Sequence, residues 1–162
     1  MEQLVQSLKD GAMQILQVPF PALQSGCILV RNHYSVISAG TEGKSVKDAR
    51  LGYVAKARAR KEEVGKVMKS VQNFGLLPTY KMVMNKLESP SPLGYCCAGE
   101  VIAVAGDVQD FRIGDLVACG GNTAVHAEVV SVPVNLCVKL PAGIDVRQAA
   151  FATLGAIAMQ GI

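Results

Sequence analysis

The 162-residue chain has few of the residues from which proteins build metal sites and disulfide frameworks. Its two histidines, His33 and His126, stand apart in strand-like stretches, where a single histidine is more often an ordinary surface or core residue than a ligand. Its five cysteines are odd in number, two are adjacent, and none forms a Cys-x-x-Cys pair. This pattern argues against both a zinc knuckle and a disulfide framework. We therefore expect reduced thiols in the core.

Long apolar runs and a leader-like start are also missing. Residues 1–10 alternate between polar and apolar, which predicts a strand and not a secretory signal. The longest apolar run, residues 149–159, is too short and too rich in small residues to span a bilayer. Because 50% of the residues are hydrophobic, we expect a globular, cytoplasmic protein with one core and no membrane partner.

No dinucleotide-binding Gly-x-Gly-x-x-Gly unit lies between a strand and a helix. The glycine-rich stretch from Gly114 to Gly121 is flanked by strands and lacks the helix that should follow it. We therefore expect the chain by itself to bind no dinucleotide.

The most informative stretch, residues 93–121, predicts two strands and the turns that direct them. Branched residues at 101–104 suit a half-buried strand, which ends at Gly106-Asp107. Gly114-Asp115 then begins a second strand at 116–119. Glycines mark sharp bends or close backbone approaches before the first strand, at 94 and 99, and after the second, at 120 and 121. Such crowding is typical of a small barrel with a site at its rim.

Further strands and one helix are expected on either side of this stretch. Residues 3–8 and 12–18 should form a hairpin across Asp10-Gly11. Near the end, Asp145 can cap a helix that contains residues 149–154. The remaining expected strands are 27–35, 124–132 and 136–140.

These patterns support a resemblance to a known family. Gly-x-x-x-x-Gly-x-Val at 94–101, followed by Gly-Asp-x-Val at 114–117, resembles the catalytic domain of the medium-chain dehydrogenase/reductase family, which includes zinc-type alcohol dehydrogenases and quinone reductases. The resemblance implies a mainly β (α+β) fold, a GroES-like (chaperonin-10-like) β-barrel over residues 1–148. It also implies that residues 149–162 lead to a nucleotide-binding Rossmann domain. We therefore expect the chain to be part of a longer enzyme. The segments at 30–42, 124–141 and 149–162 resemble the flanking parts of that domain.

A basic helical insertion at 44–88 interrupts the barrel pattern. Ser45-x-x-Asp48 can cap a helix that runs to about Arg60, and apolar periodicity at 64–74 and 80–87 predicts two more helices. The insertion carries eleven Lys and Arg against four Asp and Glu, which leaves the rest of the chain acidic. Such helices can bind nucleic acid, an anionic membrane, or an anionic substrate or cofactor phosphate. Few aromatics and no binding motif favour a solvated face packed beside an acidic surface, with no nucleic acid. The basic cluster consists of Lys56, Arg58, Arg60, Lys61, Lys66 and Lys69.

The sequence of the insertion narrows the resemblance to one subgroup of the family. Residues 56–60, 75–80 and 84–87, running into Pro-Leu-Gly-Tyr at 92–95, resemble a bacterial subgroup in which the dehydrogenase-like half is fused to a glucose-fructose oxidoreductase-type domain. Members of that subgroup are associated with sugar or polysaccharide metabolism.

The same resemblance identifies candidate site residues. In zinc-dependent relatives the loop matching residues 36–42 supplies a metal-binding cysteine and then a Ser or Thr that bonds the substrate oxygen. Here Ser38 or Ala39 stands at the cysteine position, and Thr41 and Glu42 match the hydroxyl and acidic positions that follow. Ser38, Thr41 and Glu42 have an alternative role, because polar side chains there can simply cap the next helix.

Residues 94–96 replace the second metal-binding motif. The family's metal enzymes have Gly-His-Glu where this chain has Gly94-Tyr95-Cys96, so the resemblance implies no zinc. Donors near the cleft would then have to stabilise charge on the substrate oxygen, and we expect Thr41 and Tyr95 to do so, oriented by Glu42. Ser38 and Cys96 are expected to contact the substrate. A nucleophilic Cys96 is the weaker alternative, since nothing adjacent in sequence indicates a lowered pKa.

The resulting hypothesis is the substrate-side domain of a zinc-independent oxidoreductase. NAD or NADP, bound by the Rossmann domain outside these residues, would exchange hydride with an alcohol or carbonyl of a small-molecule substrate. The isolated chain should be inactive, and its apolar C-terminal helix favours a homo-oligomer. The alternative is a dehydrogenase-like domain that has lost catalysis and serves as a binding or scaffolding module.

Overall fold

The computed structural model describes residues 1–52, 55, 58 and 61–161, which divide into two compact units. The sheet unit comprises residues 1–4, 15–38 and those from 92 onward, and the helical unit comprises the described residues of 5–14 and 39–91. None of the described helices is both long enough and apolar enough to cross a bilayer.

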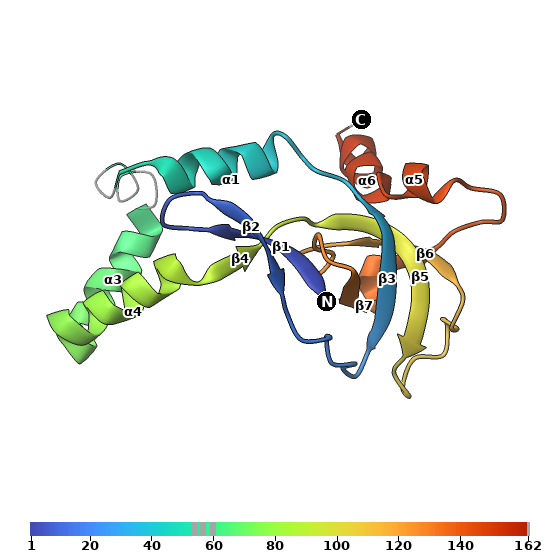
Figure 1. The fold of residues 1–162 in the computed structure, drawn as a ribbon, viewed down its shortest axis with the longest axis horizontal. Coiled ribbons are helices and arrows are strands. Elements are labelled where there is room, and N and C mark those ends of the chain that lie inside the picture. Colours follow the sequence, from blue (N-terminus) through green and yellow to red (C-terminus); the bar gives the residue numbers. More distant parts are fainter. Residues whose placement is uncertain (53–54, 56–57, 59–60, 162) are drawn as a thin grey trace. The chain divides into compact units, whose positions relative to one another are not determined.

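A five-stranded antiparallel sheet lies in the sheet unit, in the order β7-β3-β5-β6-β8. Figure 1 labels β7, β3, β5 and β6. The central position of β3 and β5 follows from their composition, because both begin with runs of buried apolar residues. The predicted strand 27–35 is confirmed residue for residue. The strands are β3 (Cys27–Ser35), β5 (Cys96–Val104), β6 (Leu116–Gly120), β7 (Val129–Pro133) and β8 (Cys137–Lys139).

Each face of this sheet packs against a different partner. One face contributes to the main core, in which Ile28, Val101 and Val132 are fully buried. The other face carries Ala98 and Ala118, which pack against the helices α5 (Val146–Ala149) and α6 (Ala152–Gln160) that follow β8. Small side chains on both partners let the helices lie close to the sheet.

The C-terminal helical segment begins where the sequence predicts. Asp145 is the N-cap of α5, and its Oδ1 accepts a hydrogen bond of 2.9 Å from the Arg147 N–H. The helix is not continuous, however: α5 ends at Ala149, and a second helix, α6, starts at Ala152.

The predicted N-terminal hairpin is confirmed. Strands β1 (Glu2–Ser7) and β2 (Met13–Gln17) pair in a three-stranded sheet of order β2-β1-β4, with β4 at Pro90–Pro92. The Ser7 N–H donates to Ala12 O (2.8 Å), and Gly11 occupies the left-handed region with φ +74°. A side chain at Gly11 would be strained there, and its Cβ would lie 3.0 Å from the carbonyl oxygen of Val46.

Three described helices form most of the helical unit, and their bounds correct one prediction. The first, α1 (Thr41–Arg50), starts before Ser45, so Ser45 is inside the helix and does not cap it. The Lys44 N–H already bonds Gly40 O at 3.1 Å, so the helical ladder begins one turn earlier than the Ser45-x-x-Asp48 pattern suggests. The Ser45 hydroxyl instead donates to Oε1 of the buried Gln6 at 3.2 Å.

The end of α1 corrects the same prediction. The chain leaves the helix at Leu51, which has extended dihedral angles, whereas the expected helix ran to about Arg60. Ala55 and Arg58 are again helical. Positions 53, 54, 56, 57, 59 and 60 lie outside the described residues, so two members of the basic cluster, Lys56 and Arg60, are not placed.

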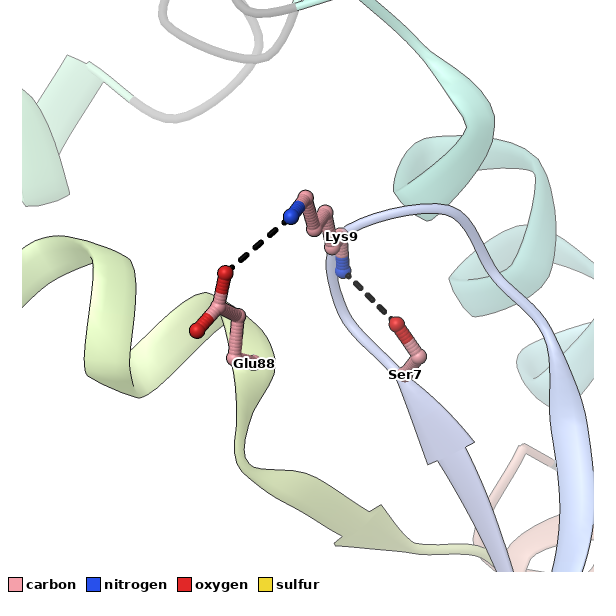
Figure 2. Close-up of polar contacts among 3 residues, drawn as sticks. All are labelled: Ser7, Lys9 and Glu88. Atoms are coloured by element: carbon pink, nitrogen blue, oxygen red, sulfur yellow. Dashed lines mark hydrogen bonds and ion pairs between the residues drawn. The ribbon is translucent and has the colours of Figure 1, made fainter.

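The two other predicted helices are confirmed as α3 (Lys61–Phe74) and α4 (Leu76–Glu88), which pack against each other (Figure 1). Gly75 separates them with φ +85°, a left-handed conformation that closes one helix and allows the next to start in a new direction. An ion pair joins the hairpin turn to the end of α4, with Lys9 Nζ 3.0 Å from Glu88 Oε1 (Figure 2). Both side chains are about half exposed, so the pair contributes little to stability.

Strand β5 corrects the predicted place of Gly99. The strand begins at Cys96, so Gly99 lies inside it, opposite Asn32 of β3, and does not precede it. A Cβ at Gly99 would lie 2.0 Å from the carbonyl oxygen of Arg31. The register of the two strands shifts between Asn32 and Tyr34 beside this contact. The glycine is therefore required by close backbone approach within the sheet and not by a bend.

The returning strand is also shorter than expected. Its residues were predicted at 124–132, but β7 covers only Val129–Pro133. The first part is held differently, because the Ala124 N–H bonds Gly121 O (3.1 Å) and the Gln3 backbone forms an isolated bridge with Ala127.

The aspartate of each Gly-Asp turn bonds to a distant segment of the chain. Asp107 accepts hydrogen bonds from the Gly26 N–H (2.9 Å) and the Ser25 hydroxyl (2.5 Å), which lower its pKa. Asp115 forms an ion pair with Lys139 (2.8 Å) and accepts from the Arg112 N–H (2.8 Å). These two contacts hold the pKa of Asp115 below its usual value.

We expect Gly99→Ala to lower the free energy of unfolding by about 1–3 kcal/mol or more, the usual cost of overpacking a filled interior. Urea unfolding followed by circular dichroism measures the change. Gly106→Ala is the matched control, because a Cβ there meets nothing within 4 Å, and its effect should stay within about 0.5 kcal/mol. Equal stability of the two variants would contradict the assigned strand contact.

We expect Asp115→Asn to destabilise the chain above about pH 4, where the carboxylate of the unfolded chain is ionised. Because the folded-state pKa is lowered, ionised Asp115 stabilises the fold, and that contribution is lost as pH falls through the folded-state value. Thermal unfolding of both proteins from pH 7 to pH 2 should show two curves that converge in acid. Asp110→Asn is the control, because Asp110 is an exposed carboxylate in the same part of the chain. A gap that persists at pH 2 would rule out this linkage.

Candidate functional site

The sheet brings two of the predicted site segments together. The Ser35 position pairs with Cys97, and the Val36 N–H donates to Cys96 O at 3.0 Å. The loop that leaves β3 at residues 36–38 therefore runs beside the start of β5, where Tyr95 and Cys96 lie. The half-buried Ser38 therefore lies at the same end of the sheet as Tyr95.

Tyr95 follows a glycine that the local packing requires. Gly94 has φ +97°, and a Cβ there would lie 2.7 Å from the backbone nitrogen of His126. Tyr95 itself is half-buried, so part of its side chain is open to solvent. A half-buried tyrosine beside a constrained backbone can donate a hydrogen bond, and a catalytic role for Tyr95 stays a prediction.

Cys96 is packed differently from its neighbour. Its side chain is buried and its Sγ donates to Ala150 O at 2.5 Å, which fastens the start of β5 to the end of α5. A buried thiol that is already bonded behaves as a small core residue. Contact between Cys96 and a substrate stays a prediction.

Thr41 and Glu42 form the first turn of α1 in the helical unit. Thr41 is exposed, whereas Glu42 is buried with 8% of its surface accessible. A carboxylate in the first turn is favourable, because it lies at the positive end of the helix dipole. The N-cap is Gly40, so neither Ser38 nor Thr41 occupies the capping position. Roles for Thr41 and Glu42 in catalysis stay predictions.

A cavity of about 340 Å³ lies in the sheet unit. Two of its lining side chains, His126 and Ser35, are hydrogen-bonded to each other, with Nδ1 of the imidazole 2.8 Å from the Ser35 Oγ. No sequence pattern indicated this pair, because the two residues lie far apart in the chain. The cavity is lined mainly by polar residues of β1, β3 and the segment before β7: Glu2, Gln3, Leu4, Ile15, Asn32, His33, Tyr34, Ser35, His126, Ala127 and Glu128.

His126 is buried, and it lies before β7 and not inside a strand as the sequence pattern suggested. It is 8% exposed, its N–H donates to Leu93 O (2.8 Å), and its carbonyl accepts from the Leu4 N–H (2.8 Å). The residue thereby links β1 to the chain that enters β5. Within residues 1–52, 55, 58 and 61–161, no three His, Cys, Asp or Glu side chains are grouped closely enough to hold a metal ion. The absence of zinc stays a prediction.

The five cysteines match the expectation of free core thiols, except that Cys137 is not fully buried. They are free thiols, and four of them are buried, namely Cys27, Cys96, Cys97 and Cys119, while Cys137 is half-buried.

Comparison with known proteins supports the fold. The family model described as the alcohol dehydrogenase GroES-like domain matches residues 65–142. No curated protein matches the sequence significantly.

Solved oxidoreductases share this architecture. The quinone oxidoreductase from Coxiella burnetii superposes with a TM-score of 0.62 at 20% identity, covering 98% of this chain and 44% of that one. Galactitol-1-phosphate dehydrogenase from Escherichia coli gives 0.61 at 17% identity, over 93% and 41% of the two chains. The Escherichia coli quinone oxidoreductase complexed with NADPH gives 0.58 at 19% identity, over 93% and 36%.

The chain thus has the GroES-like fold of zinc-type alcohol dehydrogenases and quinone oxidoreductases, mainly β with a helical insertion. It spans about two fifths of the length of the structures that it matches.

Proposed function

We propose that the chain is the substrate-side domain of an NAD(P)-dependent oxidoreductase of the medium-chain dehydrogenase/reductase family. The single observation that carries this proposal is the GroES-like fold with the loop at 36–38 held beside Tyr95 by the bond from Val36 to Cys96. In the proposed enzyme, hydride moves between nicotinamide and a carbonyl or alcohol carbon. The nucleotide is bound by a Rossmann domain outside these residues, and the isolated chain is inactive.

The proposed enzyme works without zinc. Tyr95 stands where the metal enzymes have histidine, and a phenol is a poor substitute for imidazole as a zinc ligand. Charge that develops on the substrate oxygen is then stabilised by hydroxyl donors, Thr41 and Tyr95, with Glu42 orienting one of them. Support is strongest for Tyr95, which is partly accessible on a fixed backbone. Ser38 completes the substrate contacts from the adjacent loop.

The substrate is proposed to be sugar-related. This assignment rests on a resemblance to the bacterial subgroup with a fused glucose-fructose oxidoreductase-type domain, carried by residues 56–60, 75–80, 84–87 and 92–95. The exposed apolar residues of α6, Ile157 and Met159, favour contact with a further domain or a second copy.

A binding or scaffolding role is the second candidate, and one observation favours it. Cys96, at the place of the family's carboxylate, is buried and bonded to Ala150 O, so this position supports the core. A domain that retained its fold after losing catalysis would keep such packing.

Nucleotide titration of the full-length protein separates the two candidates. We expect NADH or NADPH fluorescence to change on binding, in a preparation whose metal analysis gives less than one zinc per chain. Nucleotide binding with stoichiometric zinc would leave the oxidoreductase standing but would overturn the metal-free mechanism. No binding of either nucleotide would favour the scaffold.

Replacement of the two hydroxyls tests the site. We expect Thr41→Val and Tyr95→Phe each to lower kcat/KM by about 10²–10³-fold, the usual loss for one donor to a developing oxyanion. Steady-state kinetics of the full-length enzyme on a panel of aldoses, polyols and aldehydes measures the effect. Tyr80→Phe is a matched control, because it removes the same hydroxyl from an exposed tyrosine of α4. Unchanged turnover in both site variants would remove the catalytic assignment while leaving nucleotide binding intact.

A further inference from the structure

Three cysteines lie side by side on neighbouring strands of the five-stranded sheet. Cys97 of β5 pairs with Cys119 of β6, and Cys119 pairs in turn with Cys137 of β8. Directly opposed residues of antiparallel strands project from the same face, so the three thiols form a row across the sheet. Cys97 and Cys119 belong to the main core, and Cys137 packs against its border.

The backbone pattern brings Cys119 and Cys137 especially close. The Leu140 N–H donates to Leu116 O at 2.9 Å, which makes these opposed residues a hydrogen-bonded pair. Hydrogen-bonded and non-hydrogen-bonded pairs alternate along an antiparallel ladder. Cys119 and Cys137, three positions further along the same register, therefore form a non-hydrogen-bonded pair.

This pair type meets the geometric requirement for a disulfide. Cα atoms in a non-hydrogen-bonded pair are about 4.5 Å apart, inside the range that disulfides span. The two Sγ atoms already lie 3.6 Å apart. Little backbone movement is needed to bring them to bonding distance, because the strands and side-chain directions are already those of a cross-strand bridge.

Access distinguishes the two partners of Cys119. Cys97 is completely buried, whereas Cys137 is only half-buried and lies on the edge strand of the sheet. A small oxidant can therefore reach Cys137 from solvent but not Cys97. Cys137 is accordingly the residue that an oxidant would attack first, with Cys119 directly behind it.

We infer that Cys137 and Cys119 form a peroxide-sensitive thiol pair, in which a hydroperoxide oxidises Cys137 and Cys119 closes a reversible disulfide between β6 and β8. The inference concerns a modification site on the sheet and is independent of the proposed oxidoreductase function. All five cysteines are free thiols in the structure, so this bridge would be a change of state and not a constitutive disulfide.

The chemistry balances in two steps. The Cys137 sulfur attacks the peroxide, an S–O bond forms and the O–O bond breaks, so the sulfur becomes a sulfenic acid and the peroxide is reduced to water or an alcohol. The Cys119 sulfur then attacks the Cys137 sulfur, the S–S bond forms, and the S–O bond breaks. The hydroxyl leaves with the Cys119 proton as water.

The electrostatics of the pair favour this order. The hydrogen bond from the Cys119 thiol lowers the pKa of Cys137, which increases the reactive thiolate there. Hydrogen bonds with Cys137 and Cys97, together with burial, raise the pKa of Cys119. The raised pKa of Cys119 leaves it protonated while Cys137 reacts, so Cys119 attacks only after Cys137 has been oxidised.

Peptide mapping of the peroxide-treated chain tests the inference. The reduced chain is exposed to hydrogen peroxide, free thiols are alkylated, and cleavage after Glu128 separates the peptide of Cys119 from that of Cys137. We expect a Cys119–Cys137 linked peptide that dithiothreitol separates by reducing the disulfide. A non-reducing gel should show only monomer, because the bridge forms within one chain. A dimedone adduct should appear on Cys137 at early times.

Matched serine variants extend the test. In Cys119→Ser the Cys137 sulfenic acid should persist as the dimedone adduct, and in Cys137→Ser no linked peptide should form. Cys27→Ser is the control, since this buried thiol of β3 lies outside the row, and it should form the bridge as the parent does. A bridge between Cys97 and Cys119, a dimer joined through Cys137, or irreversible oxidation of Cys137 without a bridge would each overturn the inference. The mapping of the parent chain decides even where a variant fails to fold.

Discussion

The antiparallel pairing of β3 with β5 is the contact on which the other features of the sheet unit depend. At Gly99 the two backbones approach so closely that a Cβ would lie 2.0 Å from the carbonyl oxygen of Arg31. The register shift beside this point turns the end of β3, so that Ser35 comes opposite Cys97. The loop that follows β3 is thereby delivered to Tyr95. The absence of a side chain at Gly99 thus helps to place the candidate site at the end of β3 and the start of β5.

Small residues also allow close packing elsewhere on the five-stranded sheet. Ala98 and Ala118 admit α5 and α6 on one face, and Gly120 leaves room for Thr153, whose Oγ1 would lie 2.6 Å from a Cβ at that position. On the opposite face the row of cysteines fills the core with small, polarizable side chains. The close packing and the thiol pair therefore have a common origin, because strands that carry small residues bring their neighbours near.

For the candidate site, the sequence supplied a hypothesis about residue types and no geometry. The resemblance indicated the segments at 36–42 and 94–96, and the structure holds residues 36–38 beside Tyr95 through the bond from Val36 to Cys96. The resemblance did not reveal that Cys96 is buried and bonded to Ala150. Nor did it reveal that Ser35 bonds His126 in the lining of the cavity. Those contacts join residues that are far apart in the chain, and a single sequence does not indicate which distant residues will be in contact.

The sequence by itself determined the features that arise from local chemistry. The bounds of β3, the hairpin at Asp10-Gly11, the Asp145 cap and the helices on either side of Gly75 follow from apolar patterning, turn residues and capping groups within a few positions of each other. Tertiary structure decided what depends on register and close approach: Gly99 inside a strand, the Ser45 hydroxyl on Gln6, and Cys137 opposite Cys119. The physical reason is that a one-residue change of strand register alters every cross-strand neighbour while leaving the local patterns unchanged.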